Sequence, residues 1–182
     1  ELARDIAQKF NNDFCDEDSP LFTLPEPIVP PEAARIMSLR DGGAKMSKSD
    51  PSEMSRINLS DDADTIMKKV KKAKSDADAL PSEKAGLDGR PEALNLVTVY
   101  AAVTGESVEQ VLSQFGGEGF GKFKPALGEV LVETLSPISA RFRELKEDRE
   151  SLDAILARGA AKARELGSDT LSAAYQALGL VR

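Results

Sequence analysis

The chain has 182 residues, which suffices for one domain, or for a short segment followed by one domain. Hydrophobic residues make up 41% and aromatic residues 5%, a balance that excludes disorder throughout and favours helices over a β-sandwich or barrel. The single cysteine, Cys15, excludes an internal disulfide and a cysteine-based zinc site, so a reducing cytosol is expected. With a net charge of −7, any contact with nucleic acid must come from a local basic patch.

The first third of the chain predicts a helix, a connector and a strand-like edge. Leu2, Ile6 and Phe10 recur at four-residue spacing within residues 1–12, which predicts an amphipathic helix. Five prolines and clustered acidic residues between Asn12 and Pro31 predict an extended connector. The apolar run at residues 36–39 predicts a last strand or a strand-like loop edge, with its partner strands upstream of this chain.

The most distinctive segment is residues 45–49, Lys-Met-Ser-Lys-Ser, which lies between Asp41-Gly42-Gly43 and Asp50-Pro51. The glycines permit backbone conformations that other residues avoid, and the proline stops a helix from running through, so the segment predicts a loop. Two ammonium groups three positions apart suit a polyphosphate. The alternative interpretation is a solvated turn that is rich in lysine and serine.

Helical patterns fill the remainder of the chain. Ser60 is the predicted N-cap of a helix whose first turn is acidic and whose buried stripe is Ile66, Met67 and Val70. The lysines of this helix form the densest basic patch of the chain and comprise Lys68, Lys69, Lys71, Lys72 and Lys74. This face has two interpretations, a solvated surface that follows the helix dipole or a contact for the phosphate backbone of a nucleic acid.

Five further helical segments predict a bundle. They are Pro91–Thr104 before Gly105, about Ser107–Phe115 before Gly116-Gly117, about Phe123–Glu147, Ser151–Leu166 before Gly167, and Ser168–Leu178 before Gly179. Within the third segment, Ser136-Pro137 either kinks the helix or caps a second one. Phe120 and Phe123 alternate with basic residues and could stack on bases, but core packing at a helix start is the preferred prediction.

Residues 45–49 match the KMSKS motif of class I aminoacyl-tRNA synthetases letter for letter, and the flanking sequence resembles bacterial-type tryptophanyl-tRNA synthetases. The resemblance rests on Glu1-Leu2-Ala3-Arg4-Asp5-Ile6-Ala7, the Pro-rich segment Pro25–Pro31, Ala34-Arg35-Ile36-Met37-Ser38-Leu39 and Asp50, in this order. It continues weakly through Ala102-Val103-Thr104-Gly105 to Ala173–Gly179. An intact KMSKS motif favours the tryptophanyl over the tyrosyl branch.

The resemblance implies a mainly α fold, a class I anticodon-binding helical bundle preceded by the end of a Rossmann-like catalytic domain. The catalytic end would cover residues 1–59 and the anticodon-binding domain residues 60–182. The implied activity is ATP-dependent ligation of tryptophan to tRNA(Trp) through tryptophanyl-adenylate. Mg²⁺ would accompany ATP, no structural metal is expected, and the complete protein is expected to be a cytoplasmic homodimer without a membrane segment.

The resemblance also implies roles for individual residues. Lys45 and Lys48 would stabilise pyrophosphate, Ser47 and Ser49 would contact phosphate or the closed loop, and the backbone of Ile36 would lie against adenine. Met46 would complete the ATP-binding loop and pack it on the body of the protein. The tRNA-binding lysines would be Lys68, Lys69, Lys71 and Lys72.

Two departures from the family pattern qualify this interpretation. The 182 residues contain no histidine, so the HIGH motif of the family is absent, and the chain is expected to be a C-terminal piece that does not adenylate alone. Gly43-Ala44 stand where relatives often carry Thr-Lys, which removes a charge from the loop. The competing hypothesis is a stand-alone helical module that binds RNA or protein and retains the loop as a relic.

Overall fold

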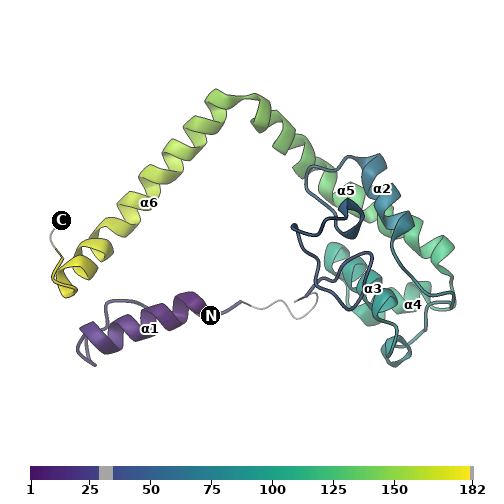
Figure 1. Cartoon of the computed structure of the whole chain (residues 1–182), viewed down its shortest axis with the longest axis horizontal. Helices are drawn as coiled ribbons and strands as arrows, with labels where there is room; N and C mark the ends of the chain where they lie inside the picture. Colours follow the sequence, from purple (N-terminus) through teal and green to yellow (C-terminus); the bar gives the residue numbers. More distant parts are fainter. Residues whose placement is uncertain (29–34, 181–182) are drawn as a thin grey trace. The chain divides into compact units, whose positions relative to one another are not determined.

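The computed structural model describes residues 1–28 and 35–180 and divides into two compact units (Figure 1). One unit comprises Glu1–Val29 with Asp148–Arg182, and the other comprises Pro30–Glu147. The described residues contain six α-helices, two short 3-10 helices and no β-strand, so the prediction of a mainly helical fold is confirmed. The Ala34 portion of the predicted family match lies outside the described residues, as do the last prolines of the predicted connector. Among the helices described, none combines the length and hydrophobicity that a membrane span needs.

The unit Pro30–Glu147 is a helical bundle around one apolar core. Its helices are α2 (Ala63–Lys72), α3 (Pro91–Thr104), α4 (Val108–Phe115) and α5 (Phe120–Glu147), and its 3-10 helices are Glu53–Ser55 and Lys84–Leu87. Helix α2 packs along α5, and α3 packs against both α4 and α5. Side chains with at most 1% exposure fill the centre: Ile66, Val70, Leu80, Leu96, Val97, Val111, Leu112, Phe123 and Leu127.

Local sequence signals set the ends of α3 and α4 as predicted. Pro91 occupies the first turn of α3, where its missing N–H costs nothing, and Gly105 ends the helix with a φ of 75°. Ser107 caps α4 in a capping box, because its hydroxyl accepts from the Gln110 N–H while the Gln110 side chain accepts from the Ser107 N–H. Phe120 and Phe123 are core residues, which confirms the preferred prediction for that segment.

Three predicted helix boundaries are wrong. Asp62 rather than Ser60 caps α2, through a 2.8 Å bond from the Thr65 N–H. Helix α5 begins at Phe120, three residues before the predicted start, and continues through Pro137, so Ser136 does not cap a second helix. The carbonyl of Glu133, which the proline leaves without an N–H partner, belongs to an exposed residue, so water can satisfy it.

The two predicted C-terminal helices are one helix, α6 (Arg149–Ala177). Gly167 lies inside α6 without a positive φ, and its position costs the helix only about 1 kcal/mol. The side chain of Asp148 caps the helix start by accepting from the Ser151 N–H at 2.9 Å. No residue of α6 within its described length is buried.

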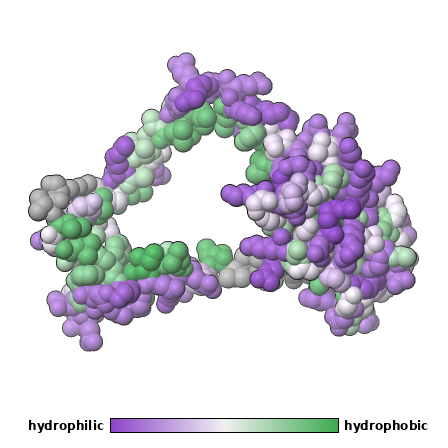
Figure 2. Space-filling model, in the orientation of Figure 1, coloured by the Kyte–Doolittle hydropathy of each residue, from purple (hydrophilic) through white to green (hydrophobic). Residues whose placement is uncertain are grey.

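Helix α1 (Leu2–Phe14) confirms the first predicted helix and extends two residues past it. The side-chain amide of Asn11 pairs with both backbone groups of Phe22, accepting from its N–H at 3.0 Å and donating to its carbonyl at 2.8 Å. The exposed apolar stripe contains Leu2 and Ile6, which are 73% and 60% exposed. Figure 2 shows this hydrophobic stripe along α1 beside a hydrophilic face.

Candidate functional site

Residues 36–46 form a short hairpin that leads into the Lys-Met-Ser-Lys-Ser loop. The Ser38 N–H donates to Ala44 at 2.8 Å, and the Met46 N–H donates to Ile36 at 3.0 Å, which places Met37 opposite Lys45 in an antiparallel bridge. Asp41 closes the turn, with its carboxylate accepting from the Gly43 N–H at 2.9 Å. The strand-like edge therefore pairs with the first residue of the motif, whereas its partner strands were expected upstream of this chain.

Serine and aspartate side chains shape the second half of the loop. The hydroxyl groups of Ser47 and Ser49 lie 2.9 Å apart, and the Asp50 N–H donates to the Ser47 carbonyl at 3.3 Å. The carboxylate of Asp50 accepts from the Ser52 N–H at 2.7 Å. These local bonds make residues 47–52 two consecutive turns, so the motif is a loop, as predicted.

Both lysines of the motif are exposed, and within the described residues neither makes an ion pair or a side-chain hydrogen bond. Lys45 lies on the hairpin and Lys48 lies on the turn that follows it. Their ammonium groups are consequently available to an anion that approaches the loop. A flexible stem lets each one follow a moving phosphate.

Apolar packing holds the base of the loop. Ile36 and Met46 are half-buried and pack against the core of the bundle. Both line an apolar cavity of about 190 Å³ with side chains of α2, α3 and α5. The expected packing of Met46 on the body of the protein is confirmed by this contact.

Arg56, which no pattern in the sequence singles out, anchors the loop on its C-terminal side. Its guanidinium is buried and donates to the Asp50 carbonyl at 2.8 Å and to the Asn58 side chain at 3.2 Å. It also forms an ion pair with Glu53. An arginine among polar neighbours carries no local pattern that separates a buried guanidinium from an exposed one, so no signal in the sequence could have found it.

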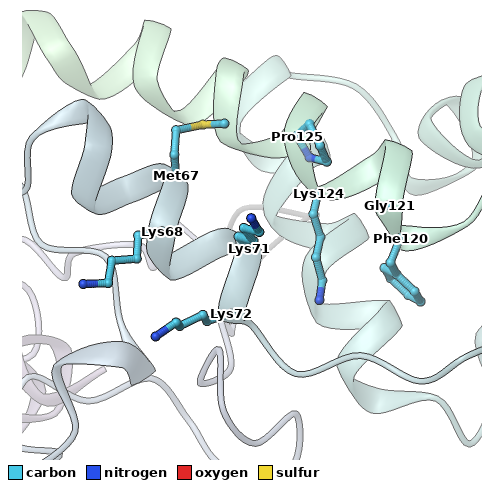
Figure 3. A pocket seen from close by; sticks show the side chains of 8 residues that line it. All are labelled: Met67, Lys68, Lys71, Lys72, Phe120, Gly121, Lys124 and Pro125. Carbon is cyan, nitrogen blue, oxygen red and sulfur yellow. The ribbon is translucent and has the colours of Figure 1, made fainter.

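A second site is the basic groove between α2 and α5, which has a volume of about 980 Å³ (Figure 3). Four lysines line this groove together with Met67 and Phe120: Lys68, Lys71 and Lys72 from α2, and Lys124 from α5. No acidic residue lines it among the residues described. The groove therefore concentrates positive charge on a chain whose total charge is negative.

Lys69 does not belong to this groove, which corrects its prediction as a surface lysine. It is 3% exposed, and its ammonium lies 2.5 Å from the Asp61 carboxylate. Helical periodicity explains the difference, because residue 69 falls on the same face as Ile66 and Val70. A lysine committed to a buried ion pair cannot meet a phosphate at the surface.

Lys124 joins the groove from a different helix and also touches the end of α2. Its ammonium donates to the Ala73 carbonyl at 2.7 Å and lies 5.7 Å from the centre of the Phe120 ring. Burial lowers the pKa of this lysine, because the charged form loses contact with water. An anion in the groove would favour the charged form again.

The end of α2 is bonded directly to the hairpin. The Lys74 N–H donates to the Leu39 carbonyl at 2.7 Å, and the Arg40 guanidinium donates to the Lys72 carbonyl at 2.7 Å. Lys74 also forms a 2.7 Å ion pair with Glu92, which lowers the pKa of Glu92 and raises that of Lys74. The loop and the groove thus belong to the same compact unit.

The described residues contain no group of three His, Cys, Asp or Glu side chains that could hold a metal ion.

Comparison with known proteins agrees with this combination of a lysine-bearing loop and a helical bundle. The model of the family of class I tRNA synthetases (W and Y) matches residues 1–136, so the chain belongs to this family. A tryptophan–tRNA ligase of Mesorhizobium japonicum is 50% identical over all of this chain, and one of Caulobacter vibrioides is 53% identical over 98% of it. The chain covers 56% and 52% of these proteins, about half the length of the curated relatives that it matches.

Solved structures extend the likeness to the fold. A tryptophanyl-tRNA synthetase from Mycoplasma pneumoniae matches 98% of this chain and 54% of its own length, with 27% identity and a TM-score of 0.75. One from Campylobacter jejuni, complexed with ADP and tryptophan, matches 98% of this chain and 53% of its own length, with 30% identity and a TM-score of 0.60. The predicted resemblance to bacterial-type tryptophanyl-tRNA synthetases is confirmed.

Proposed function

We propose that this chain is the C-terminal part of a tryptophan–tRNA ligase, to which it supplies the pyrophosphate-binding loop and the helices that bind tRNA. The observation that carries the proposal is the pair of exposed lysines, Lys45 and Lys48, on an intact Lys-Met-Ser-Lys-Ser loop whose base is packed on the bundle. Relatives at 50% identity that are tryptophan–tRNA ligases support the choice of amino acid.

In the proposed reaction, a carboxylate oxygen of tryptophan attacks the α-phosphorus of ATP and the bond to the β-phosphate oxygen breaks. Negative charge grows on the departing pyrophosphate, and Lys45 and Lys48 stabilise it. One ammonium at 4 Å from a unit charge contributes about 4 kcal/mol at an effective dielectric constant near 20. Positioning and electrostatic stabilisation suffice for such a transfer, so the protein need supply no nucleophile.

Other loop residues take supporting roles in this proposal. The hydroxyl groups of Ser47 and Ser49, already 2.9 Å apart, turn to phosphate oxygens when ATP is bound. The backbone of Ile36 lies against adenine, and Met46 keeps the loop on the core. Mg²⁺ arrives with ATP and neutralises part of the phosphate charge.

The lysines of the basic groove are proposed to contact the phosphate backbone of tRNA(Trp), with Lys68, Lys71 and Lys72 as predicted and Lys124 in addition. Charge reversal tests this role. Lys71→Glu should weaken tRNA binding and make the slope of log K against log salt shallower by about 1, because one phosphate contact is lost. Lys146→Glu, an exposed change at the end of α5, serves as the control. Equal affinities and slopes for both variants would make the groove an ordinary solvated surface.

The complete protein is proposed to be a cytoplasmic homodimer, with residues 1–59 completing the catalytic domain and residues 60–182 forming the anticodon-binding domain. Sedimentation of the complete protein tests the dimer. A single monomeric species at micromolar concentration would refute that part of the proposal.

ATP–pyrophosphate exchange on the complete reading frame tests the proposed activity, with tyrosine as the control amino acid. Exchange that depends on tryptophan and not on tyrosine is the expected result. Absence of exchange with either amino acid would refute the proposed catalysis and favour a helical module that binds RNA or protein.

A further inference from the structure

The side chain of Asn95, in the middle of α3, reaches a backbone segment 58 residues earlier in the chain. Its carbonyl oxygen accepts from the Met37 N–H at 2.9 Å, and its amide group donates to the Met37 carbonyl at 2.9 Å and to the Ser38 carbonyl at 3.3 Å. Asn95 is only 4% exposed. A buried amide thus makes three bonds to two consecutive residues of the hairpin.

The hairpin geometry explains why these bonds are needed. Met37 stands opposite Lys45, but the two hydrogen bonds that join the strands belong to the neighbouring residues. The N–H and carbonyl groups of Met37 therefore face away from Lys45 and would be left unpaired at the edge of the hairpin. The Asn95 side chain forms hydrogen bonds with both groups, as an adjacent strand would, and thereby ties this edge of the hairpin to α3.

We propose that Asn95 is a positioning residue for the Lys-Met-Ser-Lys-Ser loop. By fixing Met37, it fixes the backbone of the opposite residue, Lys45, at a set position on the bundle. Lys48 lies beyond the last hairpin bond, on the turn closed by the Asp50 N–H and the Ser47 carbonyl, so Asn95 does not fix its backbone. The pair then consists of one lysine whose backbone is tied to the bundle and one whose backbone is held only within the loop, an arrangement that places one cation at a set point beside a polyphosphate.

This inference rests on the proposed function, because positioning has a catalytic consequence only if Lys45 contacts pyrophosphate. The bonds themselves can be tested without catalysis. The chain also contains a matched control, since Asn11 makes the same amide pairing with Phe22 in the other compact unit. Asn11→Ala removes a pairing of the same kind without touching the hairpin.

Hydrogen exchange by mass spectrometry is the first arm of the test and uses the chain as it is. Asn95→Ala should accelerate exchange in a peptide covering residues 36–46 by about tenfold or more, while the peptide covering α4 keeps its rate. Asn11→Ala should leave both peptides unchanged. If Asn95→Ala does not fold, Asn95→Asp replaces it, because an ionised carboxylate keeps the acceptor and loses both donors.

The second arm is ATP–pyrophosphate exchange in the complete reading frame. Loss of positioning should lower kcat by about a hundredfold, the effect of a misplacement near 1 Å, while KM for tryptophan stays the same. Asn95→Asp should show a pH signature, because a neutral carboxylic acid can again donate to Met37. Its deficit in kcat relative to the unaltered protein should therefore shrink as the pH falls from 8 to 6, since burial raises the pKa of a carboxyl.

Several outcomes would overturn the proposal. Equal acceleration of the hairpin and α4 peptides in Asn95→Asp would make Asn95 an ordinary core residue. Faster hairpin exchange with unaltered kcat would show that the pairing has no part in catalysis. Failure of the unaltered protein to catalyse exchange would refute the proposed function and the positioning role with it, whereas the hydrogen-exchange arm would still decide whether Asn95 orders the hairpin.

Discussion

Gly42 allows a test of how closely the hairpin turn packs on α3, because the backbone of α3 leaves no room for a side chain at this position. A methyl group on Gly42 would lie 2.5 Å from the Pro91 carbonyl carbon and 2.6 Å from the Glu92 nitrogen. Carbon atoms in contact normally sit about 3.5–4.0 Å apart, so the turn would have to retreat from α3 by about 1 Å. Both obstructing atoms are main chain, and no side-chain rotation can relieve the clash.

The neighbouring glycine provides the control. A methyl group on Gly43 would meet only the Asp41 carboxylate, at 3.4 Å, which is an ordinary contact. We expect Gly42→Ala to lower the free energy of unfolding by about 1–3 kcal/mol, the usual cost of overpacking, and Gly43→Ala to stay within about 0.5 kcal/mol of the unaltered chain.

Urea unfolding followed by circular dichroism measures both variants. With a slope near 2 kcal/mol per molar urea, the midpoint of Gly42→Ala should fall by about 0.5–1.5 M. Equal midpoints for Gly42→Ala and Gly43→Ala would refute the close packing of the turn on α3. Equal midpoints would also remove the reason to expect that the hairpin at the base of the loop is held in place by α3.

Three further predictions concern charged groups. Lys48→Ala in the complete protein should slow single-turnover adenylation by about a hundredfold or more and leave tryptophan affinity unchanged; a change in tryptophan binding alone would contradict the assigned role. Lys69→Met should destabilise the bundle by about 3 kcal/mol in urea, because the Asp61 carboxylate, whose side chain is 10% exposed, loses its ammonium partner and keeps only its hydrogen bonds from Asn58. Lys68→Met at the surface should cost less than about 0.5 kcal/mol. The hydrogen bond from Arg90 lowers the pKa of Asp76 below 3.8, so this pair stabilises the fold above that pH and loses its effect as the pH falls through the folded-state pKa. Asp76→Asn should therefore lower the stability at pH 7 by about 1 kcal/mol, measured as a lower thermal midpoint. The difference should shrink towards zero as the pH falls through the lowered pKa of Asp76, and a difference that does not change with pH would contradict the assignment.

Short-range patterns were sufficient for much of the helical architecture. The ends of α3 and α4 follow from residues that act on their own backbone, a proline at a helix start, a left-handed glycine and a capping box. The loop character of the Lys-Met-Ser-Lys-Ser segment, and its resemblance to class I synthetases, were likewise visible in consecutive residues.

The proline and the glycine inside the two long helices led to wrong predictions of where the helices end, for a physical reason. Pro137 and Gly167 weaken a helix locally, yet neither ended one. The cost of each, from about 1 to 3 kcal/mol, can be met by cooperative hydrogen bonding along a helix of 28 or 29 residues, and in α5 also by the packing of its buried side chains.

The sequence by itself determined that this chain is helical, that it carries two lysines of a Lys-Met-Ser-Lys-Ser motif on a loop, and that lysines crowd one helix. Only the tertiary structure decided which of those lysines are available, because Lys69 turned inward to Asp61 while Lys124 joined the groove from another helix. The same holds for Arg56, which holds the loop through the backbone carbonyl of Asp50, and for Asn95, whose partners are backbone N–H and carbonyl groups. Every residue carries a backbone carbonyl and every residue except proline carries an N–H, so the sequence does not show which of these groups will form such a bond. The fold alone selects which of them a buried side chain will meet.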